Sequence, residues 1–562
     1  MKVLGFASLV SLSCLSVASA TILPDGRRNA NAKPLPTVPI VSVVDSAPVV
    51  SRNGTQLPPY NFTYYFDQLI DHNNPSLGTF KQRFWHTYEF YESGPIVLMT
   101  PGEANAEPYS GYLTNKTITG TTAQKNNGSV IILEHRFYGL SNPKPDLSGK
   151  SLSLHTLQQA IDDLEYFAFN VELPQPDGDK LTPNEAPWIL AGGSYSGALT
   201  SWTMVNKPGL FAAGYASSAV VEAILDFWGY FTPIHEHMPQ NCSADVAAVI
   251  AHIDSVFTSN DTSAISKIKN LFGLGAMTHL DDVAGVRNNL WDWQSLQPTS
   301  GPGARFFEFC DALEVKSGVS APAEGWGLDH ALNAWGYFWS TSYLEDLCAG
   351  STTVDCLGTY DADSTFYTDT SIDNAGRSWY WIVCNEVGYL QDGPPEDVSA
   401  IVTRLVQPDS DIRQCELMFS DVFSASNPPK MAQGVAHTNE AYLGWNVSID
   451  HLFFANGHSD PWREATVSAN GVDVQSTPAQ PVAIGDGFHC SDLSIASGTV
   501  DSTVKAVQDK WFSIVPGFLA EWTPGKYKAS RKREEPAATP IKRDASSKKA
   551  ANLFFREPVV IA

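Results

Sequence analysis

Short runs of apolar residues, each bounded by polar or glycine-containing turns, recur in the first and last thirds of the chain. They lie at residues 96–99, 130–133, 188–191, 452–454 and 482–484. Continuous apolar runs of this length are typical of strands that are buried on both faces of a parallel sheet. Between them, residues 154–169 and 198–205 have apolar positions at helical spacing. This alternation predicts an α/β fold with a mostly parallel, doubly wound sheet.

The stretch at 226–435 follows a different pattern. Residues 247–257 and 397–406 have helical spacing, whereas strand-like runs are scarce. The stretch also contains six of the seven cysteines that follow the first twenty residues: Cys242, Cys310, Cys348, Cys356, Cys384 and Cys415, with Cys490 outside it. We expect a helical, disulfide-stapled cap insertion between two parts of the sheet-forming core, at 59–225 and 436–525. The odd number leaves at least one cysteine unpaired or paired outside the chain.

The amino-terminal end has the features of a signal peptide. Lys2 precedes an apolar run at 3–17, and the small residues Ala18, Ser19 and Ala20 follow it. We therefore expect residues 1–20 to be a cleaved signal peptide, because the apolar run is too short to span a membrane.

Residues 21–58 are rich in proline, valine, asparagine and alanine. Their apolar positions follow neither the helical spacing nor the alternation of a strand. They predict an extended, propeptide-like leader, in which Arg27-Arg28 is a candidate processing site. At the other end, residues 526–562 hold 10 basic and 4 acidic side chains, which predicts a disordered basic tail.

Glycosylation sequons support passage through the secretory pathway. The Asn-X-Ser/Thr pattern occurs at Asn53, Asn61, Asn115, Asn127, Asn241, Asn260 and Asn446. Behind a signal peptide, seven such acceptors predict a secreted, extracellular glycoprotein, with a vacuolar or lysosomal location as the alternative.

Charge narrows the classes of partner. The chain has 36 Lys and Arg against 60 Asp and Glu, a formal net charge of −24. Such a surface repels nucleic acid and anionic membranes, so neither is expected as a partner. Self-repulsion falls when carboxylates are protonated, which favours an acidic working environment. No cysteine or histidine spacing is typical of a zinc site, and no cofactor or metal is expected.

A nucleophile elbow is predicted at Ser194. The apolar run at 188–191 leads into Gly192-Gly193-Ser194-Tyr195-Ser196-Gly197, and helix-forming residues follow. This strand, sharp turn and helix are the context of a hydrolase nucleophile. The residues two before and two after it must be small, and Gly192 and Ser196 satisfy that. A plain Gly/Ser turn that binds phosphate is the alternative, but no P-loop lysine follows.

The acid and the base are expected after two late strands, in the order Ser, Asp, His. Asp460 follows the apolar run at 452–454, and His489 follows the run at 482–484. His489 would take the serine proton, and Asp460 would orient the imidazole and stabilise its cation. The rival acids Asp486 and Asp492 lie too near His489 in sequence, and the rival bases His451 and His458 break the order.

An oxyanion hole needs two backbone N–H groups. We expect one from Tyr195, which directly follows the nucleophile. The other is expected from the loop after an early strand, at Gly102 or Glu103. A simple Pro-Gly turn with a solvated Glu103 is the alternative.

Several longer motifs carry a family resemblance over roughly residues 60–525. They are Phe66-Asp67-Gln68 with Asp71-His72, Thr79-Phe80-Lys81-Gln82-Arg83, Glu134-His135-Arg136-Phe137-Tyr138-Gly139, Gln159-Ala160-Ile161-Asp162-Asp163-Leu164, Gly192-Gly193-Ser194-Tyr195, Cys384-Asn385-Glu386, and Asn456-Gly457 with Asp460-Pro461-Trp462. In these the chain resembles the prolyl carboxypeptidase and dipeptidyl peptidase II family of serine peptidases, which includes fungal acid prolyl endopeptidases.

The resemblance implies a hydrolase core with a helical cap and the triad named above. It also implies cleavage after proline in peptide or protein substrates, often at acidic pH, and a role for Trp462 in an apolar pocket for the proline ring. The alternatives are a secreted esterase, a serine carboxypeptidase of the other acid family, and a hydrolase-like binding protein without catalysis. The mode of cleavage, at a chain end or internally, and the oligomeric state stay open.

Overall fold

The computed structural model describes residues 22–23, 26–43, 48–279 and 281–528. The expected signal peptide at 1–20 and most of the basic tail at 526–562 lie outside the described residues. Within them, no helix combines the length and apolar character needed to cross a membrane.

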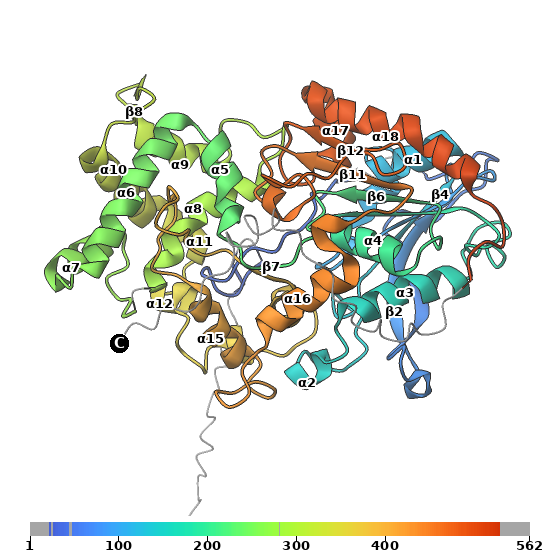
Figure 1. Ribbon diagram of the computed structural model, residues 1–562, viewed down its shortest axis with the longest axis horizontal. Coiled ribbons are helices and arrows are strands. Elements are labelled where there is room, and N and C mark those ends of the chain that lie inside the picture. Colours follow the sequence, from blue (N-terminus) through green and yellow to red (C-terminus); the bar gives the residue numbers. More distant parts are fainter. Residues whose placement is uncertain (1–21, 24–25, 44–47, 280, 529–562) are drawn as a thin grey trace, which may run out of the picture.

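A central eight-stranded sheet forms the core, on the right of Figure 1. Its order is β1-β2-β4-β3-β5-β6-β11-β12, and the pairs are parallel except for β1 with β2 and β2 with β4, which are antiparallel. The strands are β1 (Tyr64–Leu69), β2 (Thr79–Thr87), β3 (Ile96–Met99), β4 (Ser129–Leu133), β5 (Trp188–Gly193), β6 (Ala213–Ser217), β11 (Leu452–Gly457) and β12 (Val482–Gly485). The expected α/β-hydrolase sheet is therefore confirmed, and all five apolar runs lie in its strands.

Helices cover both faces of this sheet, which explains why its strands are apolar throughout. Helices α3 (Leu157–Asn170) and α4 (Tyr195–Asn206) lie on one face, and α1 (Ile118–Asn126) and α18 (Ser502–Glu521) lie on the other. Short helices α2 (Gly149–Leu152) and α17 (Ile495–Val500) complete the core.

Most of the remaining helices form a separate group, on the left and at the lower centre of Figure 1. They are α5 (Phe231–His237), α6 (Gln240–Thr258), α7 (Thr262–Leu271), α8 (Asn288–Trp291), α9 (Arg305–Glu314), α10 (Leu328–Phe338), α11 (Leu344–Cys348), α12 (Thr353–Leu357), α13 (Thr365–Thr368), α14 (Ala375–Ile382), α15 (Pro408–Met418) and α16 (Met431–Tyr442). Two small strand pairs join them, β7 (Ile224–Asp226) with β10 (Gly388–Leu390) and β8 (Val315–Lys316) with β9 (Val319–Ser320).

Three disulfides staple this helical region: Cys242–Cys310, Cys348–Cys356 and Cys384–Cys415. Cys490, in the core, is the buried free cysteine that the odd number left over.

The prediction of a helix at 397–406 is wrong. These residues form an irregular segment, and the next helix, α15, begins only at Pro408. The side chain of Asp254 on α6 accepts hydrogen bonds from the Arg404 N–H (3.1 Å) and the Thr403 hydroxyl (2.5 Å). Because Asp254, a residue distant in sequence, accepts these hydrogen bonds, the segment adopts a non-helical backbone despite its helical spacing of apolar residues.

The amino-terminal segment at 26–43 contains no helix or strand, yet much of it is buried. In Figure 1 it is the dark blue coil that passes between the helical region and the core. Asn29, Ala30 and Val38 are at most 2% exposed.

Candidate active site

A sharp turn places Ser194 between β5 and α4. Its backbone has φ 58° and ψ −127°, a conformation that costs a non-glycine residue energy and occurs mainly at functional turns. The Ser194 N–H donates to the Ser217 carbonyl (2.9 Å) on the neighbouring strand and holds the turn in place. A Cβ on Gly192 would lie 2.2 Å from the Ser196 carbonyl oxygen, so only glycine fits at 192.

His489 and Asp460 lie together after adjacent parallel strands. Asp460 follows β11 and His489 follows β12, and His489 Nδ1 is 2.8 Å from Asp460 Oδ1. Both side chains are buried, and the Trp462 N–H donates to the same carboxylate oxygen (2.9 Å). The sheet thus brings together two residues that the sequence places 29 positions apart.

The rival candidates have other partners. Asp492 accepts hydrogen bonds from Tyr215 (2.6 Å) and Ser217 (2.7 Å), and His451 pairs with Glu521 (3.0 Å). Neither is a partner of His489 in the described structure.

The imidazole of His489 is held as a strong base. Burial is the largest single influence and lowers its pKa, but the adjacent Asp460 carboxylate and the Cys490 side chain together outweigh burial and raise the pKa well above the usual value. His489 Nε2 and Ser194 Oγ are both buried, and neither has a hydrogen-bond partner among the described residues. The bond between a nucleophile and its base is often long before substrate arrives.

The loop after β3 approaches the elbow. A Cβ on Gly102 would lie 3.3 Å from Ser196 Cβ and 3.4 Å from the Tyr195 ring, so the loop backbone packs on the turn. The Gly102 N–H donates to Thr100 Oγ1 (3.3 Å), which leaves Glu103 as the better candidate of the two. Tyr195 is the first residue of α4, so its N–H has no acceptor within the helix.

Glu103 is not a solvated turn residue. Its side chain is fully buried, and both carboxyl oxygens lack hydrogen-bond partners in the described part of the chain. Burial raises the pKa of this carboxyl well above its usual value, so it is neutral in acid.

Aromatic side chains form a wall beside His489. The centre of the Trp462 ring lies 6.3 Å from that of the His489 ring. Three other aromatic rings lie closer to Trp462, at 5.4–5.5 Å: Phe227, Tyr230 and Tyr389. Sequence analysis found only Trp462. Tyr389 lies in the short strand β10, Tyr230 ends a single 3-10 turn and Phe227 precedes that turn, so none of the three stands in an element long enough to give a periodic pattern.

The family motifs form a buried polar network behind the elbow. Arg83 pairs with Glu134 through two hydrogen bonds (2.6 and 2.9 Å), and Arg136 pairs with Asp163. His135 Nε2 lies 3.0 Å from the Tyr195 hydroxyl, which links the network to the first residue after Ser194. These motifs therefore fix the scaffold under the site.

The chain matches the family serine carboxypeptidase S28 at residues 68–291 and 330–510, more than half of its length. The chain belongs to this family. Its members are serine peptidases, so this protein is one, and the resemblance to prolyl carboxypeptidase and dipeptidyl peptidase II is confirmed.

The similar proteins are also serine peptidases by name. Serine protease vicPa of Bipolaris victoriae is 35% identical over 79% of this chain and 86% of its own length. A probable extracellular serine carboxypeptidase of Arthroderma benhamiae is 30% identical over 73% of this chain and 59% of its own. The human thymus-specific serine protease is 26% identical over 76% and 82%.

Among the described residues, no group of three or more His, Cys, Asp or Glu side chains could hold a metal ion.

Proposed function

We propose that this S28 peptidase is secreted and cleaves peptide bonds on the carboxyl side of proline, with Ser194, His489 and Asp460 as its triad. The observation that carries the triad is the buried 2.8 Å pair of His489 and Asp460 beside the strained Ser194 turn. Backbone strain at the nucleophilic serine and an unpaired Nε2 on the neighbouring imidazole are both expected of a serine-hydrolase site without bound substrate.

In this mechanism His489 Nε2 takes the hydroxyl proton as Ser194 Oγ attacks the carbonyl carbon. The imidazolium then gives that proton to the leaving amine, which leaves an acyl-enzyme on Ser194. Water repeats the cycle and releases the new carboxyl end. The Asp460 carboxylate stabilises the imidazolium in both halves, and the N–H groups of Tyr195 and Glu103 stabilise the oxyanion.

The aromatic wall supports a preference for proline. The Trp462 ring lies next to His489, and Phe227, Tyr230 and Tyr389 pack around Trp462. The proline ring is compact and apolar, and it brings no N–H that would stay unsatisfied in such a pocket. Trp462 is held in place because its Nε1–H donates to Gln294 (2.7 Å).

Two sets of groups bear on the working pH. Burial raises the pKa of Glu222 and Glu386 to about 7 and that of Asp492 to about 6, so these carboxyls favour folding in acid. Together with the net charge of −24 they support acidic action. The raised pKa of His489 acts in the opposite direction, because a protonated imidazole cannot accept the serine proton. A kcat/KM optimum above neutrality would refute acidic action and leave the peptidase assignment intact.

Glu386→Gln tests the folding part of this balance. Because the pKa of Glu386 is about 7 when folded and 4.5 ordinarily, the folded chain binds more protons between these values. The contribution of Glu386 to the stability of the fold is therefore fully present below about pH 4.5 and is lost as the pH rises through 7. Glutamine keeps an acceptor for the Leu157 N–H (2.7 Å). We expect the melting temperature to fall less between pH 5 and pH 8 in the variant, by about 1–3 °C.

The matched control is Glu308→Gln, which changes an exposed carboxylate and should leave the pH dependence of melting as it is. A Glu386→Gln profile that parallels the parent would show that this carboxyl does not titrate as its burial implies.

Secretion is supported by the sequons and by one relative. Six of the seven acceptors, Asn53, Asn61, Asn115, Asn127, Asn260 and Asn446, are exposed, and Asn241 is half-buried. The six exposed acceptors are thus open to a glycosyl group. The relative from Arthroderma benhamiae is described as extracellular. A vacuolar or lysosomal location is the alternative.

Proline specificity is tested by digesting a mixed peptide library at about pH 4–5 and reading the products by mass spectrometry. We expect cuts that follow proline. The same chain treated with a fluorophosphonate that blocks active serines is the control, and it should give no cuts. Cuts spread over other residues would refute proline specificity, and their distance from the chain ends shows the mode of cleavage.

A further inference from the structure

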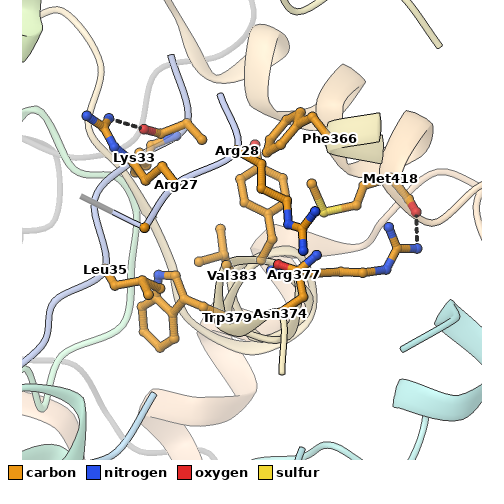
Figure 2. A pocket seen from close by; sticks show the side chains of 14 residues that line it. Arg27, Arg28, Lys33, Leu35, Phe366, Asn374, Arg377, Trp379, Val383 and Met418 are labelled. Atoms are coloured by element: carbon orange, nitrogen blue, oxygen red, sulfur yellow. Dashed lines mark hydrogen bonds between the residues drawn. The ribbon is translucent and has the colours of Figure 1, made fainter. Parts of the chain in front are cut away.

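The first part of the amino-terminal segment is anchored to the helical region. Backbone or side-chain amides of Asn29, Ala30 and Asn31 donate to the carbonyls of residues 356–358 at 2.7 Å. The Lys33 ammonium forms a buried ion pair with Asp411 of α15. Figure 2 shows that Arg27, Arg28, Lys33 and Leu35 line one pocket together with Arg377 and Trp379 of α14. Because a buried charge needs a partner, the ion pair of Lys33 with Asp411 fixes where this part of the segment binds.

The next part crosses the candidate active site. The Leu35 carbonyl accepts a hydrogen bond from Gln294 (2.8 Å), the same side chain that holds Trp462. Three residues later, Val38 packs on the elbow: its Cγ1 lies 2.6 Å from where a Cβ of Gly193 would be. Cys490 Sγ is 2.9 Å from the same point.

These two contacts bracket the triad. Leu35 is tied to Trp462 through Gln294 on one side, and on the other Val38 packs against Gly193, the residue before Ser194. Pro36 and Thr37 span the distance between them, and Pro36 is buried. Ser194 and His489 are 0% and 2% exposed, although a peptide must reach both. Beyond Val38, the Pro39 carbonyl accepts from the Tyr112 hydroxyl (2.8 Å) and the chain leaves toward the surface.

We propose that the cleft between the helical region and the core is the peptide-binding site and that residues 33–39, Lys-Pro-Leu-Pro-Thr-Val-Pro, are its internal ligand. The segment is an extended, proline-containing pseudo-substrate, and it lowers the activity of the intact chain until it leaves. This inference rests on the proposed function, because it takes Ser194 and His489 as the reacting groups. An extended peptide with proline beside the aromatic wall is then the class of ligand that the cleft selects.

The test loosens the segment without touching the triad. Lys33→Ala removes the ion pair with Asp411, and Val38→Gly removes the side chain that packs on the elbow. In the full chain, each should raise kcat/KM for a proline-containing peptide at least fivefold and speed the labelling of Ser194 by a fluorophosphonate. Ile40→Gly is the matched control, because Ile40 is 59% exposed in the same segment, and it should change neither rate.

A second measurement covers variants that fold poorly. A synthetic peptide of residues 33–41 should inhibit the Lys33→Ala or Val38→Gly chain competitively, whereas a scrambled peptide should not. Equal rates for the intact and loosened chains, with no inhibition by the peptide, would overturn the proposal. Absence of both labelling and hydrolysis in every well-folded variant would instead count against the proposed function.

Discussion

Replacing Ser194 with alanine is expected to lower kcat for peptide hydrolysis by about 10⁵-fold or more, with little change in the melting temperature. The variant removes one oxygen that has no hydrogen-bond partner in the described structure, so folding loses nothing. Catalysis loses the atom that forms the acyl-enzyme, and only binding and oxyanion stabilisation remain. Steady-state hydrolysis of a fluorogenic proline-containing peptide measures the loss, and labelling by a fluorophosphonate should disappear with it.

Ser196→Ala is the matched control, because Ser196 is the rival nucleophile two residues on and its hydroxyl is also buried and unpartnered among the described residues. It should keep most of the activity and all of the labelling. The reverse result, with labelling lost in Ser196→Ala and kept in Ser194→Ala, would move the nucleophile to Ser196.

Replacing Asp460 with asparagine is expected to lower kcat by about 10⁴-fold. The amide keeps the shape of the side chain, but its NH₂ group can donate to His489 Nδ1 and hold the imidazole in the wrong tautomer. The change also removes the carboxylate that raises the pKa of His489. The acidic limb of the kcat/KM profile should therefore move to lower pH in the residual activity, which a purely structural role would not produce.

Asp492→Asn is the control for the acid. This buried carboxyl lies three residues after His489, and its hydrogen bonds run to Tyr215 and Ser217 rather than to the imidazole. We expect a lower melting temperature and a kcat within about tenfold of the parent, since the catalytic geometry stays in place. A larger loss of kcat for Asp492→Asn than for Asp460→Asn would contradict the assignment.

The parts of the fold that the sequence predicted well are those set by local physics. Buried parallel strands must be apolar on both faces, so the runs at 96–99 and 188–191 were visible as strands without further information. Gly192 and Ser194 were visible because a strained elbow leaves so little choice of residue around it. His489 and Asp460 followed from chain order, because each comes directly after a strand.

What the sequence did not predict depends on contacts between distant segments. The segment at 397–406 has helical spacing, yet the Asp254 carboxylate decides its conformation. Tyr230 and Tyr389 stand beside Trp462 only because the helical region folds back on the core. Glu103 gave no sign of being buried, since an acidic residue in a Pro-Gly loop is ordinarily solvated.

The path of the amino-terminal segment also describes the shape of the groove. A continuous polypeptide enters from the side of Lys33, passes the elbow and departs past Pro39, with chain attached at both ends. On the proposal that this segment is an internal ligand, the groove would accept a chain without a free amino group or a free carboxylate in it. If residues 33–39 occupy the peptide-binding site as proposed, a substrate chain that continues at both ends can also lie across Ser194, and the positions of the cuts in the peptide-library digest test this directly.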